Sequence, residues 1–312
     1  MANQVAKWVV EHIIKEIEKG ERILPWQKPW ATIRPMNMIT RKPYRGCNIM
    51  LLSYSNFSSP YWLSLKQVLS LKGRVRKEEF ANKRMVTYWQ IGKYRLVNGR
   101  REYLPNDAPF CDGKSFMLRY YYVYNVEQTE GIPENKIPVL DVKKVDIDSP
   151  ESIERAQAFW DNYLALANNG LEVIDSNKAA YYPTKDKIAM PKRELFENDS
   201  SFFATLFHEG AHSTGHHTRL SRIKPEDHMS FGSEPYAKEE LIAEFASAMA
   251  CATTGITNVV DNSISYIDNW IKVLKNDPNI LISGASLGEK AFSYMSGEEV
   301  IDYEKEEEAV TV

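Results

Sequence analysis

An H-E-x-x-H motif formed by His208, Glu209 and His212 constrains this chain more than any other feature of its sequence. Two histidines four residues apart lie one above the other only on a helix. Residues 201–214 carry an apolar stripe at helical spacing, which predicts that helix. Both imidazoles can then bind one metal ion while Glu209 projects beside them as a general base. We therefore predict a metal centre with Glu209 as a catalytic residue.

Catalytic zinc takes three protein ligands, so the motif needs a partner from elsewhere in the chain. Residues 235–253 predict a helix that is apolar nearly all round, and Glu240 and Glu244 share one face of it. Buried carboxylates are costly unless they are paired or bind a metal. We predict Glu240 as the third ligand and Glu244 as the acceptor for the free N–H of a ligand histidine. Tyr236 is assigned, from its position alone, as a donor to a developing oxyanion.

Other interpretations of these residues stay open. Glu240 and Glu244 would simply face solvent if the start of their helix were exposed. A turn after the motif could bring His216 or His217 back as the third ligand, although on a continued helix His216 would lie about 6 Å further along the axis. His228 is a weaker candidate because it falls in an irregular loop.

Charge divides the chain into two halves. Residues 1–140 carry 23 Lys and Arg against 12 Asp and Glu, whereas residues 141–312 carry 16 against 30. A chain of 312 residues exceeds the usual size of one domain, and Pro and Gly interrupt the pattern near the point where the charge changes sign. We predict two domains, residues 1–145 and 146–312, and the basic one should bind polyanions.

Periodicity predicts an α+β fold. Amphipathic spacing and capping signals predict helices at residues 5–17, 64–71, 150–169, 200–214, 235–253, 261–275 and 286–295. Aromatic and β-branched runs predict strands at residues 85–88, 116–126, 171–174, 179–182 and 187–190. No stretch approaches the roughly 20 apolar residues of a membrane span, and three scattered cysteines suit a reducing compartment. We expect a cytoplasmic protein with no membrane partner.

The basic half is also rich in aromatic residues, with 5 of the 7 Trp and 10 of the 17 Tyr before residue 141. Stacking on exposed aromatic side chains, together with phosphate contacts, holds single-stranded DNA without sequence choice. A single Trp is more often part of a core than a stacking platform, so the prediction rests on the set. The candidates for stacking are Trp26, Trp30, Tyr44, Trp62 and Trp89. The candidates for phosphate contacts are Arg45, Lys66, Arg74, Arg76, Lys77, Lys83 and Arg84.

Several short motifs occur in order along the chain. In the N-terminal half they are Pro-Trp-Gln-Lys-Pro-Trp at 25–30, Tyr-Arg-Gly-Cys-Asn at 44–48, Tyr-Trp at 61–62 with Lys66 and Gln67, Val-Arg-Lys at 75–77, and residues 123–131. In the C-terminal half they are residues 208–215 and 236–244. Together they resemble the motifs of the ArdC-type antirestriction proteins of conjugative plasmids and phages.

The resemblance covers nearly the whole chain and implies a domain that binds single-stranded DNA, followed by a zincin-like metallopeptidase domain. It adds Asn48 and Gln67 to the candidate DNA contacts. The run from Glu240 to Glu244 resembles the E-x-x-x-D run of gluzincins, with Glu in place of the final Asp. Cys47 stands where the family is expected to have an aliphatic residue.

The residues predict binding of single-stranded DNA without sequence choice and hydrolysis of amide bonds with one zinc ion or another divalent metal, and the resemblance implies that these serve antirestriction for a mobile element. Two other hypotheses stay open. In one, the protein only shields DNA, and its zinc site is structural or idle. In the other, DNA serves as a tether, and the peptidase acts on a DNA-bound protein such as a restriction enzyme.

Overall fold

The computed structural model of the chain describes residues 4–19, 34–53, 57–139, 146–167, 170–224, 233–258 and 264–300. Its α-helices are α1 (Gln4–Lys19), α2 (Cys47–Ser53), α3 (Leu65–Ser70), α4 (Pro150–Leu166), α5 (Asp199–Ser213), α6 (Glu234–Thr254), α7 (Ile264–Asn276) and α8 (Asn279–Ser296). Its strands are β1 (Met36–Asn37), β2 (Tyr61–Ser64), β3 (Arg74–Val75), β4 (Arg84–Val97), β5 (Arg100–Tyr103), β6 (Gly113–Asn125), β7 (Thr129–Glu130), β8 (Glu172–Asp175), β9 (Ala180–Tyr182) and β10 (Lys187–Met190). The mixture confirms the expected α+β class.

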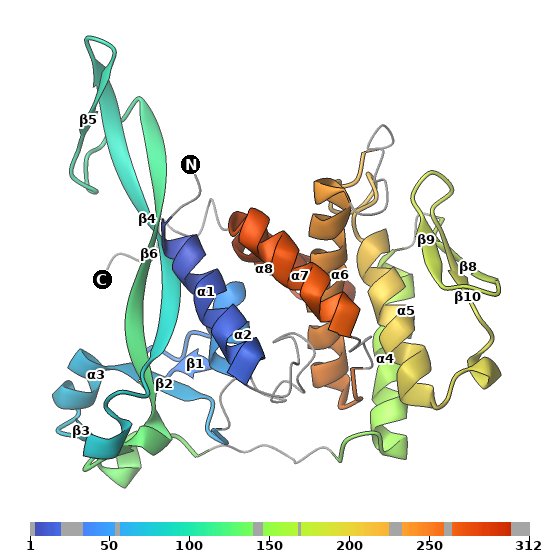
Figure 1. Cartoon of the computed structure of the whole chain (residues 1–312), viewed down its shortest axis with the longest axis horizontal. Coiled ribbons are helices and arrows are strands. Elements are labelled where there is room, and N and C mark those ends of the chain that lie inside the picture. The colour runs from blue at the N-terminus through green and yellow to red at the C-terminus, as the bar shows by residue number, and fades with distance from the viewer. Residues whose placement is uncertain are drawn as a thin grey trace.

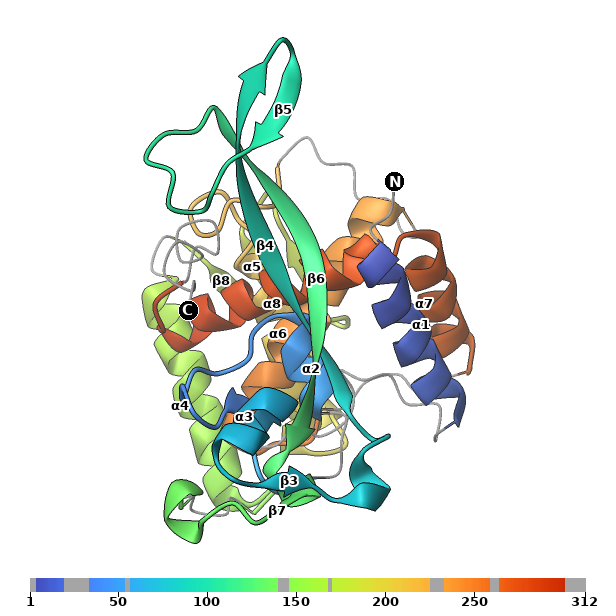
Figure 2. The same cartoon turned by 90° about the vertical axis from the view of Figure 1, so that its left-hand side faces the viewer.

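The larger sheet is built around a long ribbon of β4 and β6. Its strand order is β1-β2-β6-β4-β5, with β1 and β2 parallel and the remaining pairs antiparallel. The upper half of the ribbon extends beyond the helices at one side of the molecule (Figure 1), and in the second view the lower half crosses in front of α2 and α6 (Figure 2). A separate pair, β3 and β7, lies near the base of the ribbon.

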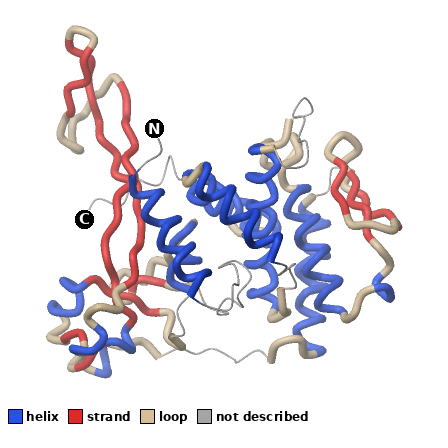
Figure 3. Tube along the Cα trace, viewed as in Figure 1, coloured by secondary structure: helices blue, strands red, loops and turns tan. Residues whose placement is uncertain are grey.

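The C-terminal helices fill the middle of the molecule, and a small three-stranded sheet lies on their far side (Figure 3). In that sheet β10 pairs with β8 in parallel and with β9 antiparallel, and β9 and β10 contact α5. Helix α6 packs against α4, α5 and α8. It is therefore apolar nearly all round, as its sequence indicates. No helix within the described ranges is both long and apolar enough to span a membrane.

One hydrophobic core joins the two ends of the chain. The apolar stripe of α1, including Val9, Ile13 and Ile17, is buried in the same cluster as residues of α5, α6 and α8. From α2, Met50 belongs to this cluster as well. The first helix thus packs on the acidic half, although it precedes the basic sheet in sequence. The expected domain boundary near residue 145 lies outside the described residues and stays a prediction.

The structure extends several sequence expectations. The predicted strand at 85–88 is the first part of the much longer β4, and the predicted helix at 286–295 is the second half of α8. A glycine lies in the part of each element that the sequence pattern missed, Gly92 in β4 and Gly284 in α8.

Gly288 permits the close approach of α6 and α8. A Cβ atom at this position would lie 2.5 Å from Phe245 Cβ and 3.0 Å from the backbone oxygen of Ile242. At Gly284 the obstruction is the end of the Leu241 side chain, at 2.8 Å from its Cδ2. The first obstruction is rigid, whereas the second can move by a change of rotamer.

We therefore expect Gly288→Ala to lower the free energy of unfolding by about 1–3 kcal/mol, because overpacking outweighs the better helix propensity of Ala. Gly284→Ala is the matched control and should cost less. Urea denaturation of both variants measures the difference. Unchanged or increased stability of Gly288→Ala would contradict the tight packing of these two helices.

Candidate metal centre

Helix α5 presents the motif histidines on one side and packs on its other side. Its N-cap, Asn198, accepts a hydrogen bond from the backbone of Ser201 at 2.8 Å. Phe203 and Phe207 are fully buried. Gly210 lies against α4, since a Cβ atom there would be 2.7 Å from the ring of Trp160. The spacing of the motif therefore separates residues available for chemistry from residues needed for packing.

Helix α6 brings the third predicted ligand to the two histidines. His208 Nε2 and His212 Nε2 are 3.1 Å apart. Glu240 Oε2 lies 3.5 Å from His208 Nε2, and its Oε1 lies 3.7 Å from His212 Nε2. Among the described residues, these three side chains form a group whose ligand atoms all lie within 4.8 Å of one another. The structure thus assembles the ligand set that the sequence predicts.

The spacing of these atoms fits a tetrahedral zinc-type ion. Ligand bonds of about 2.0–2.1 Å at tetrahedral angles place neighbouring ligand atoms about 3.3 Å apart. The distances within the group lie close to this value without any rearrangement of the helices. Two imidazoles and one carboxylate are also the donor set of a catalytic zinc site, which leaves a fourth position for substrate or water.

Opposite charges hold His208, His212 and Glu240 together. Burial would raise the pKa of Glu240, but the hydrogen bond with His208 and the charges of both histidines lower it to about 2. For His208, burial would lower the pKa, but the bond with Glu240 and the charges of Glu244 and Glu209 raise it to about 9. The carboxylates around His208 therefore favour a positive charge at the position of the imidazoles.

Glu239, which the sequence analysis did not single out, holds the second histidine. Its Oε1 lies 3.2 Å from His212 Nδ1, the nitrogen that points away from the metal position. Arg222 binds the same carboxylate through Nε at 2.9 Å and Nη2 at 2.7 Å. Arg222 also donates to the carbonyl oxygen of Ala211 in the last turn of α5. Glu239 therefore takes, for His212, the supporting role that we assigned to Glu244.

Glu244 is buried one turn further along α6, and its negative charge helps to raise the pKa of His208. Its assignment as the hydrogen-bond acceptor for a ligand histidine stays a prediction. The sequence pattern did not predict this role for Glu239. Adjacent residues of a helix point in different directions, so the assignment of Glu240 as a ligand gave no reason to place Glu239 at the same site.

The chain turns immediately after the motif, and this turn directs His216 elsewhere. His216 Nδ1 lies 2.8 Å from Thr218 Oγ1 and 3.7 Å from Oδ2 of Asp186, which is in the turn between β9 and β10. Arg219 pairs with the same Asp186 and donates to the carbonyl oxygen of Ser213 at 2.7 Å. This placement contradicts His216 as the third ligand, and the ring of His217 packs on that of His216. His228 lies outside the described residues.

Glu209 and Tyr236 flank the ligand group. Glu209 is buried, and its charge acts on both His208 and Tyr236. Burial raises the pKa of Tyr236, and the charge of Glu240 and its hydrogen bond with the phenol raise it further. Tyr236 therefore stays protonated at neutral pH, with its phenol hydrogen-bonded to Glu240. Its catalytic role stays a prediction.

The structure corrects part of the predicted DNA-binding set. Trp62 is 2 % exposed and Tyr44 is 8 % exposed, both in a core cluster with Val86 and Val123, so neither offers a ring face to a base. Trp89 is 40 % exposed on the ribbon and remains a candidate. Trp26 and Trp30 lie outside the described residues.

Two polar candidates have structural partners. Asn48 donates to Thr87 O at 2.8 Å and accepts from Thr87 N at 2.7 Å, so it pairs with the free edge of β4 as a further strand would. Gln67 completes the capping box of α3 with Ser64. These contacts explain both residues without DNA.

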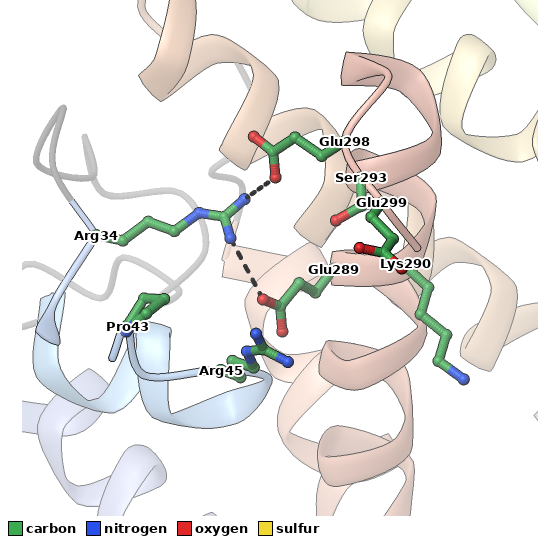
Figure 4. A pocket seen from close by; sticks show the side chains of 8 residues that line it. All are labelled: Arg34, Pro43, Arg45, Glu289, Lys290, Ser293, Glu298 and Glu299. Carbon is green, nitrogen blue, oxygen red and sulfur yellow. Dashed lines mark hydrogen bonds and ion pairs between the residues drawn. The ribbon is translucent and has the colours of Figure 1, made fainter. Parts of the chain in front are cut away.

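The predicted basic contacts are scattered around the N-terminal half. Lys66, Lys77 and Lys83 are exposed, Arg84 is partly buried in β4, and Arg74 pairs with Glu130 at 2.7 Å. Arg76 donates to the carbonyl oxygen of Glu127. Arg45 lines a pocket with Arg34, Glu289 and Glu298, where the N-terminal segment meets α8 (Figure 4). Lys66 and Lys77 are exposed to solvent, whereas Lys83 Nζ lies over the ring of Tyr122, 4.3 Å from its centre.

Comparisons with known proteins match both halves of the chain. Residues 3–124 match the family model of the N-terminal domain of anti-restriction factor ArdC, and residues 160–287 match that of a zincin-like metallopeptidase. These matches leave residue 145 between them.

Three curated relatives and two crystal structures extend over nearly the whole chain. Two DNA primase TraC proteins of Escherichia coli are 32% and 30% identical over 92% and 90% of the chain, which spans only 19% and 26% of their lengths. The uncharacterized protein y4eC of Sinorhizobium fredii is 28% identical over 93% of the chain and 91% of its own length.

The antirestriction ArdC protein of plasmid R388 has a similar structure. Its metal-free form matches with a TM-score of 0.69, at 28% identity, over 95% of this chain and 99% of the other. Its Mn(II)-bound form matches with a TM-score of 0.66, at 27% identity, over 94% and 97%. With an ArdC N-terminal domain, a zincin-like domain and this shared architecture, the chain belongs to the family of ArdC-type antirestriction proteins.

Proposed function

We propose that this protein protects the DNA of a mobile element from restriction in the cytoplasm, by binding single-stranded DNA and by hydrolysing peptide bonds at a zinc centre. The observation that carries the peptidase part is the convergence of His208, His212 and Glu240 from two helices beside a buried Glu209. The observation that carries the DNA part is the excess of basic and aromatic residues in the N-terminal half. We place the boundary between the two domains near residue 145.

Zinc suits the donor set of two imidazoles and one carboxylate, and Mn(II) is the metal in one solved relative. When bound, the ion would supply Lewis acidity that polarises water and the peptide carbonyl. His208, His212 and Glu240 would hold it. Glu239 and Arg222 fix the ring of His212, so that Nε2 faces the ion and Nδ1 faces away.

The remaining chemistry falls to side chains of the protein. Glu209 accepts a proton from the attacking water and passes it to the nitrogen of the departing amine. Tyr236, protonated at neutral pH, donates a hydrogen bond to the oxygen of the carbonyl as negative charge develops on it. The strands next to α5 include β9, an edge strand to which an extended peptide can add.

Glu209→Gln should retain metal and lose peptide hydrolysis, by roughly 100- to 10,000-fold, because the amide cannot accept the proton. Cleavage of reduced casein by the zinc-loaded protein measures activity, and metal analysis measures occupancy. Equal cleavage by the variant would contradict the role of Glu209. If wild type and variant protect incoming plasmid DNA from restriction equally, protection comes from DNA binding, and the metal centre is idle in this process.

Glu239→Gln should weaken zinc binding by roughly 10- to 100-fold, because the carboxylate that orients His212 is lost. Competition with a chromophoric chelator measures the affinity. Arg155→Gln, an exposed change on α4, serves as the control and should leave zinc affinity unchanged. Melting temperatures in excess chelator separate a loss of metal affinity from a loss of stability. Wild-type affinity in Glu239→Gln would remove Glu239 from the site.

Zinc affinity should also depend on pH in a defined direction. His208 in the metal-free protein has a pKa of about 9, so at neutral pH the ion must displace a proton from it. The apparent affinity should therefore rise about tenfold per pH unit from pH 7 and level off near pH 9. Chelator competition across this range checks the slope. An affinity that is independent of pH between 7 and 9 would contradict the protonated state of His208.

A further inference from the structure

The ribbon of β4 and β6 is long, twisted and largely free of covering elements. Its strands pair without interruption from Arg84 opposite Val123 to Tyr94 opposite Gly113. These eleven pairs span about 35 Å at about 3.4 Å per residue. The long helices lie on one side of the ribbon, and the short helix α3 lies beside its base on the other side (Figures 1 and 2).

Alternation along the strands shows which face meets the helices. Thr87, Leu118 and Tyr120 share one face, because directly paired residues point to the same side. Thr87 Oγ1 lies 3.3 Å from the thiol of Cys47 in α2, and the ring of Tyr120 lies 5.5 Å from that of Trp8 in α1. Leu118 is buried in the main core. This is the inner face of the ribbon.

The opposite face is buried at its base, where Val86 and Val123 pack with Leu52 of α2 and with Trp62, and its upper part carries exposed aromatic and polar side chains. We call this upper part the outer ribbon face and define it as Tyr88, Gln90, Met117, Arg119 and Tyr121. The rings of Tyr88 and Tyr121 lie 5.8 Å apart at 62°. Arg119, directly opposite Tyr88, donates from Nε to Gln90 Oε1 at 2.9 Å. Two rings and one guanidinium plane thus lie next to one another on a partly exposed surface.

Exposed aromatic rings in a row mark an interaction surface rather than a core. Tyr88 is 47 % exposed and Tyr121 is 38 % exposed. Residues 84–125, over both faces and the connecting loops, carry seven Lys and Arg against three Asp and Glu, and Arg119 is the cation of the outer ribbon face. The positive charge of the ribbon indicates a polyanionic ligand. The exposed rings indicate a ligand with unstacked bases that can pack on them. A duplex hides its base faces, whereas a single strand offers them.

We propose that single-stranded DNA lies along the outer ribbon face, with bases stacked on Tyr88 and Tyr121 and a phosphate or base on Arg119. The inference rests on the proposed function and names the surface responsible for it. It also changes the candidate set, because the sequence analysis selected only Trp89 from the ribbon beyond its base, and Trp89 pairs with Leu118 on the inner face.

Binding of a fluorescein-labelled oligothymidine to the full-length protein, followed by fluorescence anisotropy, tests the surface. Tyr88→Thr keeps a strand-forming residue and should weaken binding roughly 5- to 100-fold through loss of one stacked base. Arg119→Gln should reduce the slope of the logarithm of affinity against the logarithm of salt concentration by about one. Tyr88→Phe keeps the ring and should bind like wild type.

Tyr182→Thr is the matched control, because Tyr182 is 46 % exposed on β9, on the far side of the molecule. Its affinity should equal that of wild type. If wild type itself fails to bind, the proposed function fails. If wild type binds and Tyr88→Thr binds equally well, the function stands and the outer ribbon face is wrong. Loss in Trp89→Thr alone would place the strand on the inner face.

A hairpin duplex of the same length distinguishes the form of DNA. Tyr88→Thr should affect its binding less than binding of the single strand, and an equal loss would overturn the assignment to unstacked bases. Crosslinking of a bromodeoxyuridine oligonucleotide to the wild-type protein needs no folded variant. Crosslinked peptides should contain Tyr88 or Tyr121, and crosslinks confined to other segments would contradict the proposal.

Discussion

The burial of several carboxylates on one apolar helix is the constraint on which the rest of the C-terminal half depends. The side chains of Glu239, Glu240 and Glu244 project from two turns of α6, and Glu209 lies on the neighbouring helix α5. Each charge costs free energy unless an opposite charge lies close to it. Arg222 compensates Glu239, whereas His208 and His212 share Glu240. A divalent cation would balance the negative charge that remains, so metal binding and stability are coupled here.

The same helices connect this centre to the N-terminal half. Glu289 of α8 is buried and accepts a hydrogen bond from the backbone of Gly46 at 2.7 Å, and Arg34 lies 3.4 Å from it (Figure 4). Gly46 has a φ of 56°, and a Cβ atom there would lie 3.0 Å from Ser286 Oγ. Glycine therefore suits this contact for two reasons. Together with the shared core around α1, this fixes the base of the ribbon relative to the metal centre.

Local sequence patterns predicted the residues whose roles follow from helical geometry. The motif on α5 and Glu240 on α6 could be identified because residues four apart share a helix face and buried carboxylates need a partner. Glu239 and Arg222 could not, because their meeting depends on how a turn after α5 folds back on α6. Two of the stacking candidates, Tyr44 and Trp62, were wrong for a related reason. Composition does not separate Trp62 from Trp89, and only the tertiary fold buries the first and leaves the second exposed.

The positions of the ribbon and of the metal centre in the molecule affect how the two proposed activities would cooperate. The ribbon and helix α5 with its small sheet lie at opposite sides of the molecule (Figure 1). The C-terminal half is acidic, so it repels DNA, and a strand on the ribbon would not enter the metal centre. Binding would instead raise the local concentration of any protein on the same DNA near the peptidase. Under the proposed function, this arrangement favours a DNA-tethered peptidase over a site that acts on DNA itself.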